Sequence, residues 1–215
     1  MKNYSAFLFD ADGTLIDTID LIIRCFVHTC KKFGNLDIAP QEIRKNVGMT
    51  LREQMQMYLG PLTDERFSVI AQEHMDLQLK LYPQYLKAFP GVAEGLAMLK
   101  KQGKRCVVVT SRRRNTLDLY LKETGIYDYF EAFITPENTD KHKPDPDPAL
   151  AALALLSANK SEALFIGDSV FDIACAVNAG IDSAFVKWSG NDPADMPVQP
   201  TFFLDDVRSL CVPCS

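Results

Sequence analysis

AFLFDADGTL, residues 6–15, is the stretch of sequence that decides the fold. Its four apolar residues, Ala6–Phe9, predict a short strand that is covered on both faces, and Asp10 ends that strand. Asp12 follows two residues later, and Gly13 permits a tight turn and a close backbone approach. Two carboxylates in this arrangement can face one cavity, where one acts as nucleophile and the other moves a proton. An Asp-rich turn that caps a helix would explain the same residues without any chemistry.

Beyond this stretch, short apolar runs alternate with helical patterns, which is typical of a parallel α/β sheet. The predicted strands are Ala6–Phe9, Arg105–Thr110, Ala132–Thr135, Ala163–Ile166 and Ser183–Val186. The predicted helices, most of which end at a glycine or begin with a proline, are Val92–Gln102, Thr116–Thr124, Pro148–Leu156 and Phe171–Ala179. We therefore expect a Rossmann-like core with a parallel sheet and helices on both of its faces.

Residues 18–85 interrupt this alternation, because apolar residues recur there at helical spacing and no strand pattern separates them. The recurring residues are Ile19, Ile22, Ile23, Phe26, Cys30, Leu51, Met55, Leu59, Phe67, Ile70 and Met75. We predict an all-helical cap inserted at 18–85, with the catalytic core formed by 1–17 and 86–215. Methionines are adaptable side chains that suit either a core or a pocket, and we favour core packing for Met49, Met55, Met57 and Met75.

The composition is that of an ordinary globular chain, with 215 residues, 47% hydrophobic and 24% charged. The 28 acidic and 23 basic residues give a net charge of −5, which disfavours a nucleic-acid partner because phosphate backbones are anionic. No apolar run approaches the roughly twenty residues of a membrane span. The chain enters its first strand without a basic and hydrophobic leader, so we expect a cytoplasmic protein.

Six cysteines are scattered along the chain, and in a cytoplasmic protein of this size we expect reduced thiols. They are Cys25, Cys30, Cys106, Cys175, Cys211 and Cys214. Cys211 and Cys214 form a Cys-x-x-Cys pair, but no second pair or nearby histidine completes a metal site. We therefore assign this pair to a terminal tail without a predicted role.

Three further segments follow predicted strands, at the sheet edge where open α/β folds bind their ligands. Thr110-Ser111 offers hydroxyl groups for a phosphoryl oxygen or a helix cap. Lys143 lies in a proline-fixed loop, where it is either a fixed charge in a site or part of a solvated loop. Asp168 and Asp172 lie one helical turn apart, as ligands for a hard cation or as acids favoured at a helix N-terminus.

Taken together and in this order, the four segments resemble the haloacid dehalogenase superfamily of phosphatases with a helical cap. The motifs that carry the resemblance are Asp10-x-Asp12-Gly-Thr, Thr110 after an apolar strand, Lys143, and Gly-Asp168-x-x-x-Asp172. The segment Lys143-Pro-Asp-Pro-Asp-Pro and its surroundings are similar to phosphoglycolate phosphatases and related pyrophosphatases. The resemblance covers nearly the whole chain.

The resemblance implies a role for each matching residue in an Mg²⁺-dependent phosphatase. Asp10 is the nucleophile that becomes an aspartyl phosphate, and Asp12 is the acid and later the base. Thr110 binds a phosphoryl oxygen, and Lys143 neutralises charge between nucleophile and phosphate. The implied metal site combines Asp10 and Asp168 with the backbone carbonyl of Asp12, while Asp172 supports either the metal or Lys143.

Two further interpretations concern substrate binding near these motifs. Ser111 is a candidate ligand for phosphate beside Thr110, and Arg52 is a candidate for an anionic substrate group, although a surface arginine is the commoner case. The run Arg112-Arg113-Arg114 would attract anions, but we favour a solvated helix start. The expected substrate is a small phosphorylated metabolite, either a phosphoglycolate-like ester or pyrophosphate, and the protein is expected to be a monomer or homodimer without membrane partners.

Other classes remain as alternatives. A phosphomutase of the β-phosphoglucomutase type would share the core and differ only in its cap. A signalling receiver also combines acids, a hydroxyl residue and a lysine on a parallel sheet. Its phosphorylated aspartate, however, follows a middle strand along the chain, whereas Asp10 follows the first. A binding module without catalysis is disfavoured because every expected acid is present. A dinucleotide enzyme is disfavoured because no Gly-x-Gly-x-x-Gly follows a strand.

Overall fold

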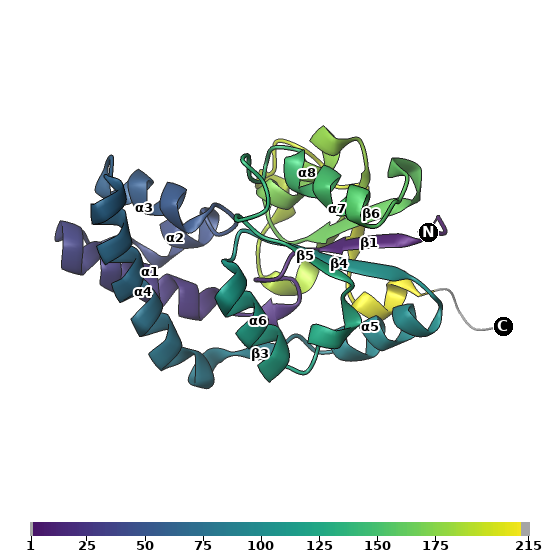
Figure 1. The fold of residues 1–215 in the computed structure, drawn as a ribbon, viewed down its shortest axis with the longest axis horizontal. Helices are drawn as coiled ribbons and strands as arrows, with labels where there is room; N and C mark the ends of the chain where they lie inside the picture. Colours follow the sequence, from purple (N-terminus) through teal and green to yellow (C-terminus); the bar gives the residue numbers. More distant parts are fainter. Residues whose placement is uncertain (1, 212–215) are drawn as a thin grey trace.

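The computed structural model describes residues 2–211, and its central feature is a parallel sheet of six strands (Figure 1). The strand order is β5-β4-β1-β6-β7-β8, so that β1 lies in the middle with β4 and β6 as its neighbours. The strands are β1 (Ala6–Phe9), β4 (Arg105–Val109), β5 (Ala132–Ile134), β6 (Ala163–Gly167), β7 (Asp182–Val186) and β8 (Phe202–Leu204). Parallel pairing brings the carboxyl ends of all six strands to one edge, where ligands of open α/β sheets bind.

Alternate residues of each strand pack on opposite faces of the sheet, as the period of a β-strand requires. In β1, Phe7 and Phe9 pack with residues of α5 (Val92–Lys101) and α6 (Arg114–Glu123). Ala6 and Leu8 belong to a second cluster with residues of α7 (Asp147–Leu155) and α8 (Val170–Ala179). Both faces are therefore covered, which explains why the strands are apolar throughout, and the predicted Rossmann-like fold is confirmed.

Four helices between the first and third strands form a group at one end of the molecule (Figure 1). They are α1 (Ile19–Gly34), α2 (Pro40–Lys45), α3 (Leu51–Leu59) and α4 (Asp64–Tyr85). The group has a small hydrophobic cluster of its own, formed by Ile22, Phe26, Ile43, Met55 and Ile70. A separate core allows these helices to keep their shape if they move as a unit relative to the sheet.

Local signals fix where these helices begin and end. Thr50 and Glu53 form a reciprocal capping box at the start of α3, with the Thr50 N–H donating to Glu53 Oε2 at 2.9 Å. Asn35 adopts a left-handed conformation with φ of 51° and ends α1. At these two ends, polar residues rather than the apolar periodicity mark the helix boundary.

The two chain segments that join the helical group to the sheet lie side by side. Ile16 and Asp17 (β2) pair antiparallel with Lys87 and Ala88 (β3). The side chains of Lys87 and Asp17 also form an ion pair with an Nζ to Oδ2 distance of 3.2 Å. Paired connections of two residues each form a narrow joint, where changes in a few backbone angles would move the whole group.

Three strands of the structure, β2, β3 and β8, were not predicted from the sequence, because each is very short. β2 and β3 contain two residues each, and β8 contains three. Their stability comes from pairing with another segment, which no local pattern reveals. Cys214 lies outside the described residues. Among residues 2–211, no helix is long and apolar enough to cross a membrane.

Candidate active site

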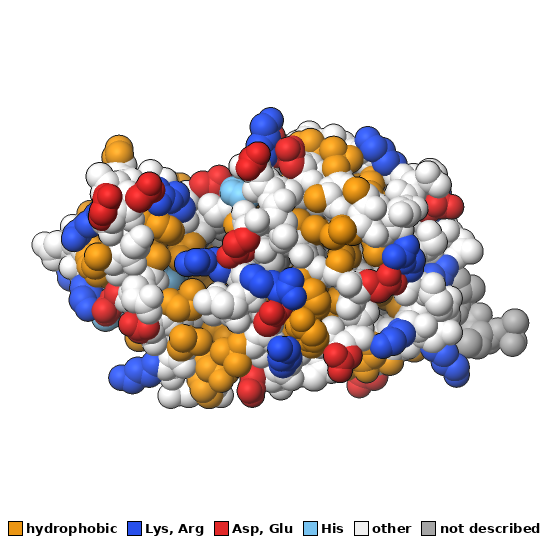
Figure 2. Space-filling view, viewed as in Figure 1, with side chains coloured by type: hydrophobic (Ala, Val, Ile, Leu, Met, Phe, Trp, Pro, Cys, Tyr) orange, Lys and Arg blue, Asp and Glu red, His pale blue; other side chains and the backbone are white. Residues whose placement is uncertain are grey.

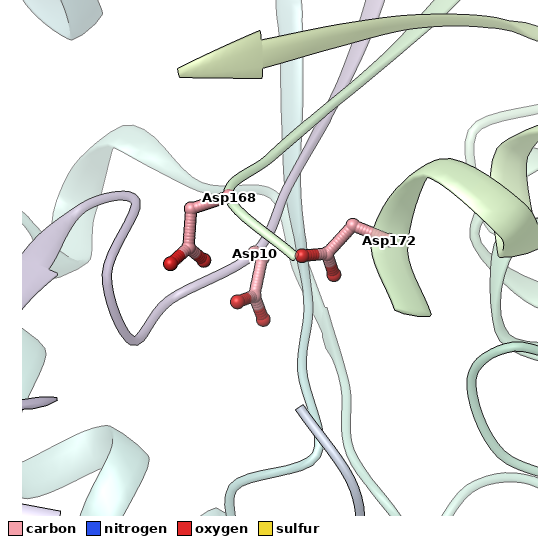
Figure 3. Close-up of side chains that lie close together, drawn as sticks. All are labelled: Asp10, Asp168 and Asp172. Carbon is pink, nitrogen blue, oxygen red and sulfur yellow. The ribbon is translucent and has the colours of Figure 1, made fainter. Parts of the chain in front are cut away.

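Three acids from the first and fourth motifs, Asp10, Asp168 and Asp172, meet at the carboxyl edge of the sheet (Figure 3). Asp10 follows β1, Asp168 follows the neighbouring β6, and Asp172 lies in the first turn of α8. One carboxylate oxygen from each of the three lies within 4.8 Å of the others, and all three side chains are buried. Strand order therefore unites residues that are more than 150 positions apart in sequence.

Lys143 reaches into this cluster from the loop between β5 and α7. Its Nζ lies 2.8 Å from Asp10 Oδ1 and 2.6 Å from Asp172 Oδ1, and the side chain is buried. Burial by itself would lower the pKa of Lys143, but the adjacent Asp10 and Asp172 carboxylates outweigh it and hold that pKa above its usual range. The lysine is therefore a permanent positive charge at the oxygen of Asp10.

Asp10 and Asp168 are carboxylates whose charged forms are disfavoured in this cluster, and a bound cation would offset that cost. Burial, followed by the charge of Asp172, raises the pKa of Asp10 to about 7, against the opposing effect of Lys143. Burial, followed by the charges of Asp172 and Asp10, holds the pKa of Asp168 well above its usual range. Three buried carboxylates against the ammonium of Lys143 leave an excess of negative charge, and oxygen ligands suit a hard divalent cation. The residues present thus fit a cation such as Mg²⁺.

Asp168 is held by a partner that sequence analysis missed. The side-chain amide of Asn191, in the loop after β7, donates to Asp168 Oδ2 at 2.8 Å and to the Asp168 carbonyl at 3.0 Å. The turn at Gly13 packs directly against the same carboxylate, since a Cβ there would lie 2.2 Å from Asp168 Oδ2. Gly13 has a φ of 80°, so both space and backbone conformation require glycine. The only sequence signal for Asn191 was its position beyond another strand of the sheet.

Asp172 uses both of its oxygens within the protein. Oδ1 accepts from Lys143, while Oδ2 accepts from the Ser169 N–H at 3.0 Å and the Ser169 hydroxyl at 2.6 Å. Ser169 in turn caps α8. Of the two roles considered for Asp172, support of the metal or of Lys143, this geometry favours the support of Lys143.

Asp12 points to a different partner from the three clustered acids. Arg112 Nε lies 3.1 and 2.9 Å from the two Asp12 oxygens, and Arg112 Nη2 lies 2.6 Å from Oδ1. The Thr18 hydroxyl also donates to Asp12 Oδ1. The interpretation of Arg112 as part of a solvated helix start was wrong, because the burial of an arginine depends on the elements around it. Arg113 and Arg114 fit that interpretation, since both are half exposed and paired with surface acids.

The two hydroxyl residues of the second motif differ in their surroundings. Thr110 is buried at the end of β4, and its Oγ1 accepts from the Arg112 N–H at 3.1 Å. The Ser111 hydroxyl instead donates to the carbonyl of Gly48 at 2.5 Å. Gly48 lies in the loop between α2 and α3, so this hydrogen bond connects the sheet edge to the helical group. Ser111 thus joins the core to the helical group in this structure.

Arg52 does not reach the site. Its guanidinium pairs with Asp64 at 2.7 Å and lies over the ring of Phe67 with its carbon 4.2 Å from the centroid. Arg52 and Asp64 sit on adjacent helices, so their pairing keeps the side chain on the outer surface of the helical group. The arginine that the structure brings to this edge of the sheet is Arg112, which contacts Asp12.

A small cavity of about 80 Å³ lies between the acids and the helical group. Polar groups of the core line one side, and mostly apolar side chains of the helical group line the other. Its lining residues are Asp10, Asp12, Ile22, Phe26, Val47, Gly48, Met49, Leu51, Gln54, His74, Met75, Gln78, Thr110, Ser111, Arg112, Arg113, Thr116 and Asp168. Two of the methionines assigned to core packing, Met49 and Met75, therefore line the cavity, whereas Met55 is in the core and Met57 is exposed.

A parallel sheet with a lysine and clustered acids at its carboxyl edge is suited to bind and transfer phosphoryl groups. The family model described as haloacid dehalogenase-like hydrolase matches residues 7–186, and the chain belongs to this family. It is a hydrolase that acts on phosphate esters or phosphoanhydrides. The resemblance inferred from the four motifs is thereby confirmed.

Similar proteins carry related descriptions. A "putative pyrophosphatase PpaX" from Caldanaerobacter subterraneus subsp. tengcongensis is 38% identical over 208 residues, which cover 96% of this chain and 92% of that protein. A "putative haloacid dehalogenase-like hydrolase" from Bacteroides fragilis has a TM-score of 0.86 with 28% identity, covering 97% of this chain and all of that one. A "putative phosphoglycolate phosphatase" from Lactobacillus plantarum has a TM-score of 0.84 with 26% identity, covering 97% and 98%.

Proposed function

We propose that this protein is a magnesium-dependent phosphatase that hydrolyses a small phosphorylated metabolite through an aspartyl phosphate on Asp10. The observation that carries the proposal is the 2.8 Å contact between Lys143 Nζ and Asp10 Oδ1 in a buried cluster of acids. A carboxylate nucleophile and a phosphate repel each other, so a fixed cation beside the nucleophile is what the reaction requires. Phosphoglycolate-like esters and pyrophosphate are the substrates that we propose.

In the first half of the reaction, a carboxylate oxygen of Asp10 attacks the phosphorus atom. The bond between phosphorus and the leaving oxygen breaks, and the leaving oxygen takes a proton from Asp12. Lys143 and the Thr110 hydroxyl bind the phosphoryl oxygens during the transfer. Both groups lie at the edge of the sheet beside Asp10, which supports these roles.

In the second half, a water oxygen attacks the phosphorus of the aspartyl phosphate. Asp12 takes a proton from that water, and the bond between phosphorus and the Asp10 oxygen breaks. Inorganic phosphate leaves, and Asp12 has its proton again for the next turnover. The same residue thus serves first as acid and then as base.

The residues proposed to hold Mg²⁺ are Asp10 and Asp168 together with the backbone carbonyl of Asp12. Asp172 completes the acidic cluster and holds Lys143 in place. The ion, when bound, neutralises charge at the phosphoryl group and offsets its repulsion from the carboxylates. Asn191 and Thr14 orient Asp168 by hydrogen bonds of 2.8 and 3.4 Å to its carboxylate.

We further propose that residues 18–85 form a cap on a core made of 1–17 and 86–215. The paired segments β2 and β3 would serve as the hinge. A closing cap and a cavity of about 80 Å³ leave room for a small ligand and no room for a polymer. Charges of both signs are interspersed on the face in Figure 2, which also supports a partner other than nucleic acid. Four buried cysteines without disulfides support a cytoplasmic location.

A hydrolysis screen over small phosphorylated metabolites tests the proposal, with magnesium and with EDTA. We expect inorganic phosphate in stoichiometric yield from several esters or from pyrophosphate, and no turnover in the Asp10→Asn variant. Formation of sugar-phosphate isomers without net phosphate release would show a mutase instead. A long-lived phosphoprotein formed from acetyl phosphate, without turnover of any ester, would indicate a receiver.

A further inference from the structure

The carboxylate of Asp12 is fully engaged in this structure. Arg112 contacts both of its oxygens at 2.6 to 3.1 Å, and the Thr18 hydroxyl adds a further hydrogen bond to Oδ1. Among the described residues, Oδ2 has Arg112 Nε as its one donor, at 2.9 Å, so the guanidinium competes with a leaving oxygen or a water molecule for this carboxylate. We therefore expect Asp12 to part from Arg112 when it transfers a proton.

Arg112 is itself held in place on every other side. Its Nη1 donates to Gln78 Oε1 at 3.1 Å and to Thr116 Oγ1 at 3.3 Å, and its guanidinium carbon lies 4.5 Å from the centroid of the Tyr120 ring. Gln78 belongs to α4 in the helical group, whereas Thr116 and Tyr120 belong to α6 in the core. When Asp12 leaves, the guanidinium remains where it is, in the wall of the cavity.

Without Asp12, that guanidinium would be a buried charge without an anion. Separating a buried pair and leaving one partner uncompensated is strongly unfavourable. The planar fork of arginine binds carboxylate and phosphate in the same bidentate manner. An anionic group of the ligand can therefore take the place of the Asp12 carboxylate with little change in the arginine.

The other cationic side chains near the cavity already form ion pairs with acids of the protein. Lys143 contacts Asp10 and Asp172, and Arg113 is half exposed and pairs with Glu137 at 3.5 Å. His74, which also lines the cavity, is neutral because burial, followed by the charge of Arg112, lowers its pKa to about 3. Among the described lining residues, Arg112 is the buried cation that a second anionic group of a ligand would meet.

We propose that Arg112 selects substrates with two anionic groups and that it releases Asp12 by exchange of partners. The phosphoryl group to be transferred binds at Asp10, and the second anion displaces the Asp12 carboxylate from Arg112. Asp12 is then free to protonate the leaving oxygen. This inference rests on the proposed phosphatase function. With a ligand that lacks a second anion, Asp12 would stay bound to Arg112 and would not protonate the leaving oxygen.

The test compares two esters that differ only in the second anion, phosphoglycolate and ethyl phosphate. Their leaving groups are both alkoxides that need a proton, so both depend on Asp12. We expect kcat/KM of the wild-type enzyme to be at least about a hundredfold higher for phosphoglycolate, a difference of about 2.7 kcal/mol. In Arg112→Gln that ratio should fall by at least about tenfold, and Arg112→Lys should recover part of it because the charge is kept.

Arg114→Gln is the matched control, since Arg114 lies two residues after Arg112, at the start of α6, but pairs with Asp118 at 2.7 Å and does not line the cavity. It should keep the wild-type ratio. A general loss of folded enzyme would lower both esters equally, so the ratio separates selection from structural damage. If Arg112→Gln fails to fold, the ratio in Arg112→Lys decides in its place.

An unchanged ratio in the Arg112 variants, or equal kcat/KM of the wild-type enzyme for the two esters, would overturn the inference. Neither result would affect the phosphatase proposal, because both esters would still be hydrolysed. Failure of the wild-type enzyme with magnesium to hydrolyse either ester or pyrophosphate would instead refute the proposed function. The two failures are therefore distinguishable in one set of assays.

Discussion

Lys143 Nζ lies 2.8 Å from Asp10 Oδ1, inside a buried cluster in which Asp172 holds the same ammonium at 2.6 Å. Lys143 comes from the loop before α7 and Asp10 from the end of β1, so the contact joins two distant segments of the chain. It places a positive charge at the carboxylate oxygen that we propose as the nucleophile toward an anionic phosphate. Removing this charge should therefore affect both the fold and the reaction.

The first prediction concerns Lys143→Met. The variant leaves Asp10 and Asp172 without their common cation, and we expect a loss of about 3–5 kcal/mol in the free energy of unfolding. Turnover at saturating substrate should fall by about 10²–10³-fold. Urea denaturation and steady-state kinetics provide the two measurements, with Lys141→Met in the same loop as control because its side chain is exposed. Activity above a tenth of wild type would contradict the role assigned to Lys143.

The second prediction concerns the metal. The pKa of Asp10 is raised from its usual 3.8 to about 7 by burial, followed by the charge of Asp172, so the folded protein holds a proton there that the unfolded chain has already lost. In metal-free buffer, the contribution of Asp10 to stability should therefore fall as the pH rises from about 4 to 7. Magnesium should reverse this loss and release protons when it binds near pH 6.5.

Calorimetry in two buffers of different ionisation enthalpy measures that proton release. Asp168→Asn should weaken magnesium binding by at least about tenfold, whereas Asp140→Asn on an exposed loop should not. Zinc should support less activity than magnesium, because oxygen ligands suit the harder ion. Full activity in excess EDTA would refute the metal site.

The third prediction concerns Asp12→Asn. An amide can neither give nor take the proton, so both halves of the reaction should slow down. With p-nitrophenyl phosphate, whose leaving group needs no proton, the second half should suffer more, and phosphorylated Asp10 should accumulate. Rapid quench followed by mass spectrometry of the intact protein detects it. Equal slowing with no phosphoprotein would argue against a double role for Asp12.

The fourth prediction concerns His74, which is buried between Thr29 and the ring of Phe26. Burial, followed by the charge of Arg112, lowers its pKa from 6.5 to about 3, so the unfolded chain takes up a proton that the folded protein refuses. The contribution of His74 to stability should therefore fall as the pH drops from about 6.5 toward 3, by up to about 1.4 kcal/mol per pH unit, and it is opposite in sign to the contribution of Asp10. Urea denaturation at several pH values gives the free energy of unfolding as a function of pH, and this pH dependence should be weaker in His74→Gln. His142→Gln, in a partly exposed loop, should keep the pH dependence of the wild-type protein.

The sequence alone determined the α/β class, five of the six strands of the main sheet, and the helical segment after β1. It also indicated Asp10, Thr110, Lys143 and Asp168 as a group. These inferences succeed because a strand covered on both faces is apolar throughout, and because parallel strands bring their carboxyl ends to one edge. Both facts are visible in short stretches of sequence.

Only the tertiary structure decided which charged groups are partners. Nothing in the sequence around Arg112, which precedes α6, or around Arg52 in α3 tells their surroundings apart, yet one is buried against Asp12 and the other pairs with Asp64 on the surface. Asn191 reaches Asp168 from a loop that carries no motif. Burial and pairing of a charge depend on which elements pack together, and that packing is set by the whole core rather than by the residues around the charge.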